Sequence, residues 1–429
     1  MTRLGPVRWR RRDFLCVTPT ALACSLLTRQ SRAEAQRAAD NSQEIAGAFV
    51  EFGNGSSSTL SPSDRREALS FVGQQLERLC GLAGSGYPEY TTGGKWQFRG
   101  PSSWTAGYLP GMLWLMYGHT KDPLWAERAR RWTDPIAAVR NAGGALNFGV
   151  LFMPTLVAGY RLTGDDSYRQ FALEAAASLA RRYTPEGKYI RYGSGKDEGV
   201  LIIDDLIDLS LLYWAAKETG QARFSEIATS HALVTIKATV QKNGSSIQAV
   251  ELDPRTGAKI AARPRQGITP ESCWSRGQAW AIYSLPEIYG YTREDRFLKT
   301  AERMANWWID HVPDDQVPYW DFDAPPAADT PRDSSAAALT AGGLWELSRL
   351  VKDKARANRY RAVALKTLDS LTERYLATGD ARDNGRILLH ATTWKSRGLG
   401  VDESLILGDY YYLELLLKVI KEQAAARVG

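Results

Sequence analysis

The sequence predicts an all-α fold, an (α/α)6 toroid of six helical hairpins with a minor β-hairpin insertion. Three observations predict it: a short phrase that repeats between helical segments, an alternation of amphipathic and apolar segments, and a scarcity of strand-like patterns. No Pro/Ser-rich linker or charged block divides the chain. We therefore expect residues 36–429 to form a single domain, although their number would also allow two.

The repeated phrase is a threonine followed five residues later by an aromatic residue. It occurs at 120–125, 163–168, 219–224 and 292–297, and a weaker copy ends at Tyr360. Most copies end an apolar segment with a glycine or polar residue, which suits a helix C-terminus, and carry an acidic residue that suits the next N-terminus. The aromatic residues lie 43 to 73 residues apart, as in a helix-hairpin repeat with insertions of variable length.

Two kinds of helix alternate between these phrases. An amphipathic helix lies at the surface, whereas one that is apolar all round must be buried. The amphipathic, outer helices are predicted at 64–80, 123–140, 165–182, 222–240, 294–311 and 354–376. The apolar, inner helices are predicted at 105–119, 147–160, 203–217, 276–291, 334–350 and 408–425.

Only one stretch, about 246–262, has a strand-like pattern, and Asp253 to Gly257 form its predicted hairpin turn. In a toroid all inner helices run in the same direction, so their N-termini meet at one mouth. The residues at or just before these N-termini are Trp104, Asn147, Asp204, Arg276, Asp333 and Asp409. Aromatic, carboxylate and arginine side chains around one opening are typical of a sugar-binding pocket.

The N-terminus predicts export. Arg11-Arg12-Asp13-Phe14-Leu15 resembles a twin-arginine signal, a modestly apolar stretch follows, and Ala33-Glu34-Ala35 resembles a cleavage site. We expect residues 1–35 to be a signal peptide and the mature protein to be periplasmic or secreted, without membrane attachment. The apolar stretch is too short to span a bilayer stably.

The formal net charge of +6 comes mostly from that signal. Residues 1–35 hold seven arginines against Asp13 and Glu34, so the remainder is near +1 and nucleic acid is not an expected partner. Cys80 and Cys273 have no metal-ligand spacing, and the four histidines are scattered. We expect no metal and no disulfide, since twin-arginine export carries proteins that folded in the cytoplasm.

Several long segments carry a family resemblance. They are Trp104 to Trp114, Ile202 to Asp204 leading to Trp214, Trp274 to Trp280, Tyr319 to Phe322, Arg332 to Ser335, and Gly408 to Leu413. In this order they resemble the unsaturated glucuronyl hydrolases of glycoside hydrolase family 88. The resemblance implies a glycoside hydrolase that hydrates the C4=C5 double bond of a terminal unsaturated uronic acid on a lyase-generated oligosaccharide. No cofactor is implied, because this double bond supplies the reactivity.

The resemblance also implies roles for single residues. Asp204 is expected to be the general acid and base, although a helix N-cap is the competing structural interpretation. A proton donor needs a raised pKa, which we expect from burial and from a nearby carboxylate, Asp205 or Asp208. The substrate-binding positions are matched by Trp104, Tyr192, Gln248, Gln266, Arg276 and Trp280. Arg276 is expected to clamp the substrate carboxylate through two parallel hydrogen bonds.

Three departures affect the reaction end of the pocket. Leu146-Asn147 stands where the family has a His-Asp pair whose aspartate assists at the double bond, and Gln248 replaces a histidine. Asn147 can form hydrogen bonds but cannot move a proton. Three interpretations remain open: hydration through Asp204 with Asn147 orienting the ring, hydrolysis of a saturated uronide on the same scaffold, or an inactive sugar-binding protein.

Overall fold

The structure, a computed structural model, describes residues 60–141, 147–191 and 199–426. The predicted signal peptide, 1–35, lies outside these ranges. Within them, Cys80 and Cys273 are free thiols, as expected. No helix in the described part of the chain is both long and apolar enough to cross a membrane.

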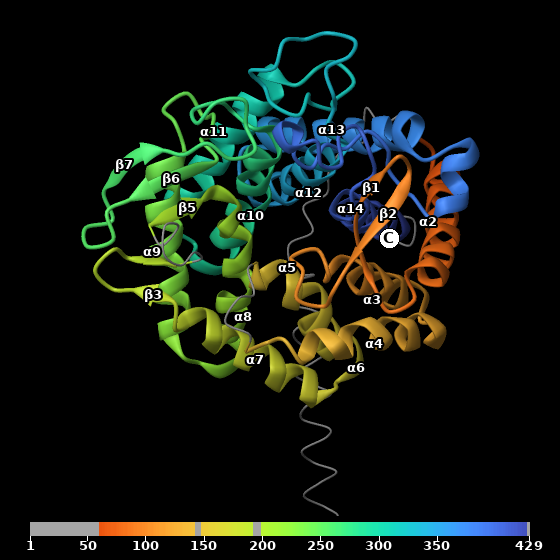
Figure 1. The fold of residues 1–429 in the computed structure, drawn as a ribbon, viewed down its shortest axis with the longest axis horizontal. Coiled ribbons are helices and arrows are strands. Elements are labelled where there is room, and N and C mark those ends of the chain that lie inside the picture. The colour runs from red at the N-terminus through yellow and green to blue at the C-terminus, as the bar shows by residue number, and fades with distance from the viewer. Residues whose placement is uncertain (1–59, 142–146, 192–198, 427–429) are drawn as a thin grey trace, which may run out of the picture. The chain divides into compact units, whose positions relative to one another are not determined.

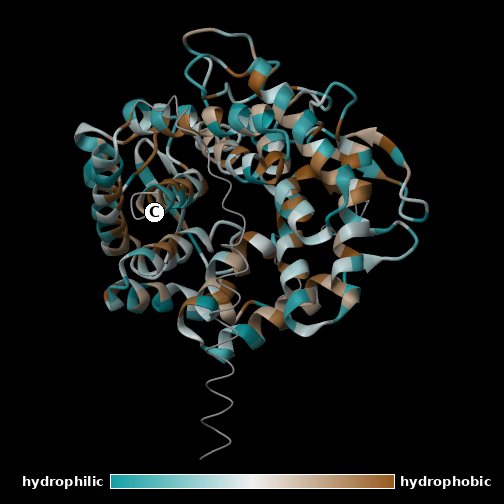
Figure 2. Ribbon diagram, turned by 180° about the vertical axis from the view of Figure 1, so that it is seen from behind, coloured by the Kyte–Doolittle hydropathy of each residue, from teal (hydrophilic) through white to brown (hydrophobic). Residues whose placement is uncertain are grey.

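Six outer helices occur where the amphipathic segments predict them: α2 (Pro62–Ala83), α4 (Pro123–Ala137), α7 (Asp166–Ala180), α9 (Ala222–Thr239), α11 (Asp295–His311) and α13 (Lys354–Ser370). The repeated phrase marks the starts of α4, α7, α9 and α11. Asp122 caps α4 through the backbone N–H of Leu124, and Asp165 caps α7 through that of Ser167. Figure 2 shows that these helices mix hydrophilic and hydrophobic residues, as an outer layer should.

The inner layer also follows the prediction. It contains α3 (Tyr108–Thr120), α5 (Phe148–Phe152) continued by a π-helical turn (Met153–Val157) and α6 (Ala158–Thr163), a 3₁₀ turn (Ile203–Asp208) continued by α8 (Leu209–Thr219), α10 (Ser275–Thr292), α12 (Ser334–Leu350) and α14 (Ile406–Ala425). All but one residue of α12 from Ser334 to Ser348 is buried. Figure 1 shows the inner helices surrounded by the outer ones. The last inner helix, α14, contacts the first, α3, so the ring closes.

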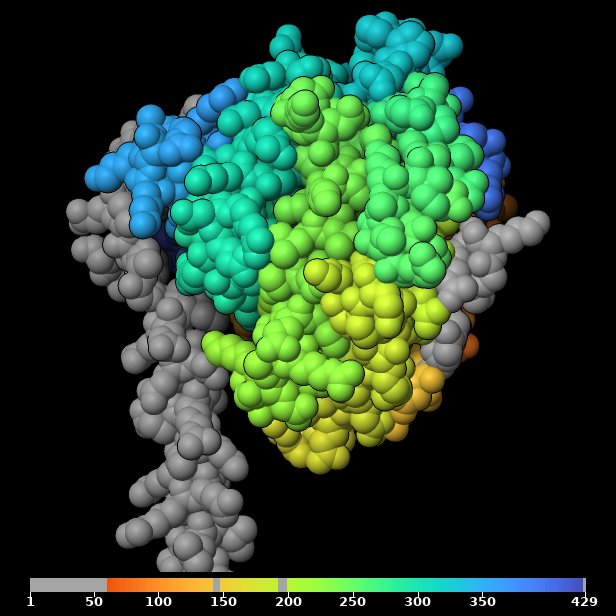
Figure 3. Space-filling model, turned by 90° about the vertical axis from the view of Figure 1, so that its left-hand side faces the viewer, coloured from red at the N-terminus to blue at the C-terminus, as the bar shows by residue number. Residues whose placement is uncertain are grey.

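The prediction of a single strand-like stretch was wrong in part. The expected hairpin exists as β6 (Ala249–Leu252) and β7 (Lys259–Ala262), but β5 (Val200–Ile202) joins it in a three-stranded antiparallel sheet. Two further hairpins are present, β1 (Tyr87–Thr92) with β2 (Lys95–Arg99) and β3 (Tyr183–Thr184) with β4 (Tyr189–Ile190). In Figure 3, the residues from α7 to α11, coloured yellow-green to teal, cover the side of the molecule on which the three-stranded sheet lies.

Candidate active site

A cavity of about 420 Å³ lies where several inner helices begin. Its walls include four of the six residues predicted at the mouth, namely Trp104, Asn147, Asp204 and Arg276. The remaining two stabilise structure. Asp333 caps α12 through the backbone N–H groups of Ser335 and Ala336, and Asp409 accepts a hydrogen bond from the backbone of Leu388.

Asp204 is held at the cavity by its backbone. It is the second residue of the 3₁₀ turn that leads into α8, so it is not the helix N-cap of the competing interpretation. The preceding residue, Ile203, donates its backbone N–H to the carbonyl of Gln248 at 2.9 Å, next to the β5–β6 pairing. Oδ1 of Asp204 is buried and finds no hydrogen-bond partner among the described residues, whereas Oδ2 lies 3.5 Å from Nε2 of Gln248.

Burial raises the pKa of Asp204 to about 6, and the charges of Arg265 and Arg276 oppose this rise. Asp205, one of the carboxylates expected to act on Asp204, interacts with it by charge repulsion. Burial, followed by the charges of Asp208 and Asp204, holds the pKa of Asp205 well above its usual value. Asp208 does not share a face with Asp204 at α-helical spacing, because this turn is 3₁₀, and it accepts the backbone N–H of Gly149.

Two glutamines form a ladder beside Asp204. Gln248 donates through Nε2 to Oε1 of Gln266 at 2.8 Å, and its Oε1 accepts the backbone N–H of Gln266 at 2.9 Å. Gln266 in turn donates to the carbonyl of Thr393 at 2.8 Å. The ladder thus links the residue before β6, the loop after β7 and the segment before α14. It fixes the side of the cavity next to Asp204.

Asn147 lines the cavity in a left-handed conformation, with φ 63° and ψ 58°. Asparagine adopts this region more readily than most non-glycine residues. Its side chain makes no hydrogen bond within the residues that the structure describes and is free to meet a ligand. It carries neither charge nor a transferable proton.

Trp104 is fixed by a carboxylate that the sequence did not reveal. Its indole N–H donates to Oε1 of Glu89 at 3.1 Å, and Oε2 of Glu89 accepts from Nε of Arg99 at 2.5 Å. Glu89 and Arg99 come from the β1–β2 hairpin and also line the cavity. The hydrogen bonds among Trp104, Glu89 and Arg99 hold the half-buried indole of Trp104 in place as part of the cavity wall.

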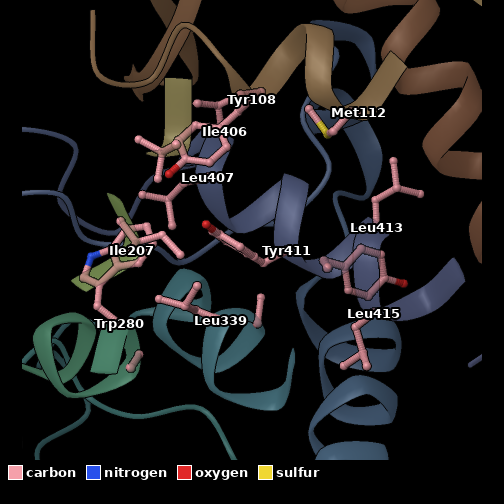
Figure 4. Close-up of a cluster of buried hydrophobic side chains, with 14 of the residues drawn as sticks. Tyr108, Met112, Ile207, Trp280, Leu339, Ile406, Leu407, Tyr411, Leu413 and Leu415 are labelled. Atoms are coloured by element: carbon pink, nitrogen blue, oxygen red, sulfur yellow. The ribbon is translucent and has the colours of Figure 1, made fainter. Parts of the chain in front are cut away.

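Trp280 also reaches the cavity, but most of its surface is buried. Figure 4 places it beside Ile207 and Tyr411 in the core, and its ring lies edge-on to Tyr411 with 5.8 Å between centroids. Trp274 is buried, and its ring faces the guanidinium of Arg276 at 4.6 Å. Both indoles contribute apolar surface to the wall of the cavity.

Arg276 is not placed as a free carboxylate clamp, contrary to the sequence prediction. It is 1% exposed, and Nη1 binds Oδ2 of Asp333 at 2.5 Å and the carbonyl of Thr392 at 2.7 Å. Nη2 donates to the carbonyl of Thr393 at 2.7 Å. A buried arginine with a carboxylate partner and two carbonyl acceptors stabilises the cavity wall.

Sequence reasoning missed several lining residues: Glu89, Arg99, Arg265, Trp394 and Arg397. The adjacency of Arg265 to Gln266 was an available signal for one of them. Tyr192, a predicted binding residue, lies outside the described residues. Across the part of the chain that the structure describes, no group of three or more His, Cys, Asp or Glu side chains could hold a metal.

Comparisons with known proteins agree with this architecture. Residues 84–426 match the model of Glycosyl Hydrolase Family 88. An unsaturated chondroitin disaccharide hydrolase of Streptococcus pneumoniae is 34% identical over 329 residues, which are 75% of this chain and 83% of that protein.

Solved structures are similar as well. The unsaturated glucuronyl hydrolase of Bacillus sp. GL1 has a TM-score of 0.79 at 32% identity, covering 83% of this chain and 96% of that one. A variant of the Streptococcus agalactiae unsaturated glucuronyl hydrolase, complexed with dGlcA-GalNAc6S, has a TM-score of 0.75 at 28% identity, covering 87% and 97%.

Proposed function

The chain belongs to Glycosyl Hydrolase Family 88, and on that premise we propose that it removes a terminal 4,5-unsaturated uronic acid from lyase-generated oligosaccharides by hydrating the C4=C5 double bond. It is a glycoside hydrolase of the unsaturated glucuronyl hydrolase type. We propose a disaccharide as the substrate, because a cavity of about 420 Å³ is at the small end of ligand sites.

One observation carries the proposal: a buried, unpartnered carboxyl oxygen in the cavity, on an aspartate whose pKa is raised to about 6. A carboxylic acid with this pKa is protonated in roughly a tenth of the molecules at pH 7, and it loses its proton readily. Asp204 donates that proton to C4, and the positive charge that forms at C5 is shared with the ring oxygen. The Asp204 carboxylate then takes a proton from the water that adds at C5.

The product of this addition is a hemiketal at C5. When its ring C5–O bond breaks, C5 becomes a ketone and C1 is left as a hemiacetal, which releases the shortened sugar. Asp204 is protonated again and ready for another cycle. In this scheme Asn147 orients the sugar ring by hydrogen bonding, and all proton transfers go through Asp204.

The two other interpretations are not favoured. Hydrolysis of a saturated uronide normally uses two carboxyl groups on opposite sides of the glycosidic bond. The second carboxylate among the described cavity residues is Glu89, which already accepts hydrogen bonds from Arg99 and Trp104. An inactive binding protein would have no use for a carboxyl group of raised pKa that lacks a partner.

The experiment is to follow the ultraviolet absorbance of the conjugated double bond while purified protein acts on a panel of lyase-generated disaccharides. We expect the absorbance to fall with at least one member, which also identifies the polysaccharide. A flat trace across the panel with folded protein would reject the proposal. Appearance of a reducing sugar without loss of absorbance would point to conventional glycosidic cleavage.

We further propose export through the twin-arginine signal. The supporting feature is Arg11-Arg12 followed by Phe14-Leu15 and an apolar stretch. Replacing both arginines by lysine should retain the protein in the cytoplasmic fraction, and N-terminal sequencing of the exported protein should start near Gln36. Export of the double variant at the normal rate would refute this part.

A further inference from the structure

Four arginines line the cavity, and two of them are already paired. Arg276 binds Asp333 at 2.5 Å, and Arg99 binds Glu89 at 2.5 Å. The charge of each is balanced by a protein carboxylate before a substrate enters. Each ion pair is therefore close to neutral and should attract an anionic sugar less strongly than an unpaired arginine would.

Arg265 and Arg397 are the other two, and both side chains are exposed. Over the ranges that the structure describes, neither guanidinium group makes a hydrogen bond or an ion pair. Their contacts are with the ring of Trp394, whose centroid lies 3.8 Å from the guanidinium carbon of Arg397 and 6.0 Å from that of Arg265. Since Arg397 is stacked on the indole, Arg265 has more freedom to meet a ligand.

The backbone of Arg265 is fixed close to the reaction centre. The next residue, Gln266, is bound through its backbone N–H to Gln248, and Gln248 reaches Oδ2 of Asp204. The charges agree with this placement. Among the charged groups that lower the pKa of Asp204, Arg265 has the largest effect, ahead of Arg276.

We infer that Arg265, and not Arg276, binds the carboxylate of the terminal uronic acid. The inference rests on the proposed function, because that carboxylate is attached to C5, at one end of the double bond that Asp204 protonates at C4. A residue that binds it must therefore lie near Asp204 and must have hydrogen-bond donors free. Arg265 meets both conditions, whereas both Nη atoms of Arg276 already bind Asp333, Thr392 and Thr393.

The test compares an unsaturated uronyl disaccharide with its methyl ester, which lacks the charge. The wild type should hydrate the acid at least about tenfold better than the ester in kcat/KM, the usual value of a charge-assisted hydrogen bond. Arg265→Gln should lose about tenfold or more on the acid, mainly through KM, and should act equally on both compounds. Arg263→Gln is the matched control, because Arg263 is two residues away, exposed, and paired with Glu251 at 2.8 Å outside the cavity.

The outcomes separate the inference from the proposed function. If Arg265→Gln keeps the wild-type preference for the acid, or if Arg397→Gln alone abolishes it, the inference is wrong while hydration still stands. Equal kcat/KM values of the wild type on the acid and on the methyl ester would also overturn the inference. If the wild type consumes neither compound nor any other unsaturated disaccharide, the proposed function itself has failed.

Discussion

Nη1 of Arg276 lies 2.5 Å from Oδ2 of Asp333, and both side chains are at most 1% exposed. Asp333 uses its other oxygen to cap α12, and Arg276 also binds the backbone carbonyls of Thr392 and Thr393. Two inner helices and the segment before α14 are therefore joined at one buried ion pair. The pair stabilises the wall of the cavity, although Arg276 is one of its lining residues.

Breaking this pair should destabilise the fold. Arg276→Met leaves Asp333 buried without its cation, which typically costs about 3–5 kcal/mol of unfolding free energy. Chemical denaturation should show this loss, and Asp333→Asn should show a loss of similar size. Wild-type stability in Arg276→Met, together with a selective rise in KM for the uronate, would restore the clamp role for Arg276.

Asp204→Asn should reduce kcat by about 10²–10⁴ or more, because the amide cannot donate the proton to C4. Asparagine has nearly the same shape, so circular dichroism should show an intact fold. The measurement is the loss of double-bond absorbance at saturating substrate. Appreciable residual turnover would exclude Asp204 as the general acid.

The same substitution should raise stability at neutral pH. Since the pKa of Asp204 is raised from 3.8 to about 6, the native state holds a proton that the unfolded state releases. Stability therefore falls as pH rises from about 4 to about 6, and above that the full cost, up to about 3 kcal/mol, remains. Asp204→Asn removes this cost, so its gain in unfolding free energy should be present at pH 7 and absent near pH 4. A variant that is less stable than the wild type at pH 7 would contradict the burial argument.

The pH dependence of activity should have a single basic limb within the working range. The proposed mechanism needs protonated Asp204, so kcat/KM should fall about tenfold per pH unit above about pH 6. Asn147 and Gln248 do not titrate and add no second limb. Arg265→Gln should move the limb to higher pH, because the charge of Arg265 lowers the pKa of Asp204. An additional acidic limb between pH 5 and 6, which persists in both variants Asn147→Gly and Gln248→Leu, would reveal another catalytic group.

Local patterns predicted most of the fold. The inner helices are apolar nearly all round, and the caps Asp122 and Asp165 lie in the repeated phrase, so both features could be read within a few residues. The β1–β2 hairpin was missed because Tyr87–Thr92 contains Pro88 and is buried on both faces, which removes the alternation that marks a strand.

The site was predictable to a smaller extent, because partners came from distant parts of the chain. Asp204 and Trp104 lie near helix starts and could be recognised from the local sequence. The ion pair between Arg276 and Asp333 could not, because the two residues are far apart in the chain. Trp394 and Arg397 line the cavity from the segment before α14, far along the chain from Trp104. These contacts depend on tertiary packing, which a periodicity in the sequence does not encode.

Asn147 provides the remaining prediction, since it distinguishes hydration through Asp204 from a site that needs a second acid. Asn147→Asp should change kcat/KM by less than about threefold, because the proton path runs through Asp204 alone. Asn147→Gly keeps the left-handed backbone without strain but removes the amide, and it should lower kcat/KM by about two- to tenfold, the value of one neutral hydrogen bond. Both are measured by the decay of double-bond absorbance on the best disaccharide of the panel. A large gain in Asn147→Asp would show that this chain has lost a carboxylate on which its chemistry once depended, and Asp204 could then no longer be regarded as sufficient.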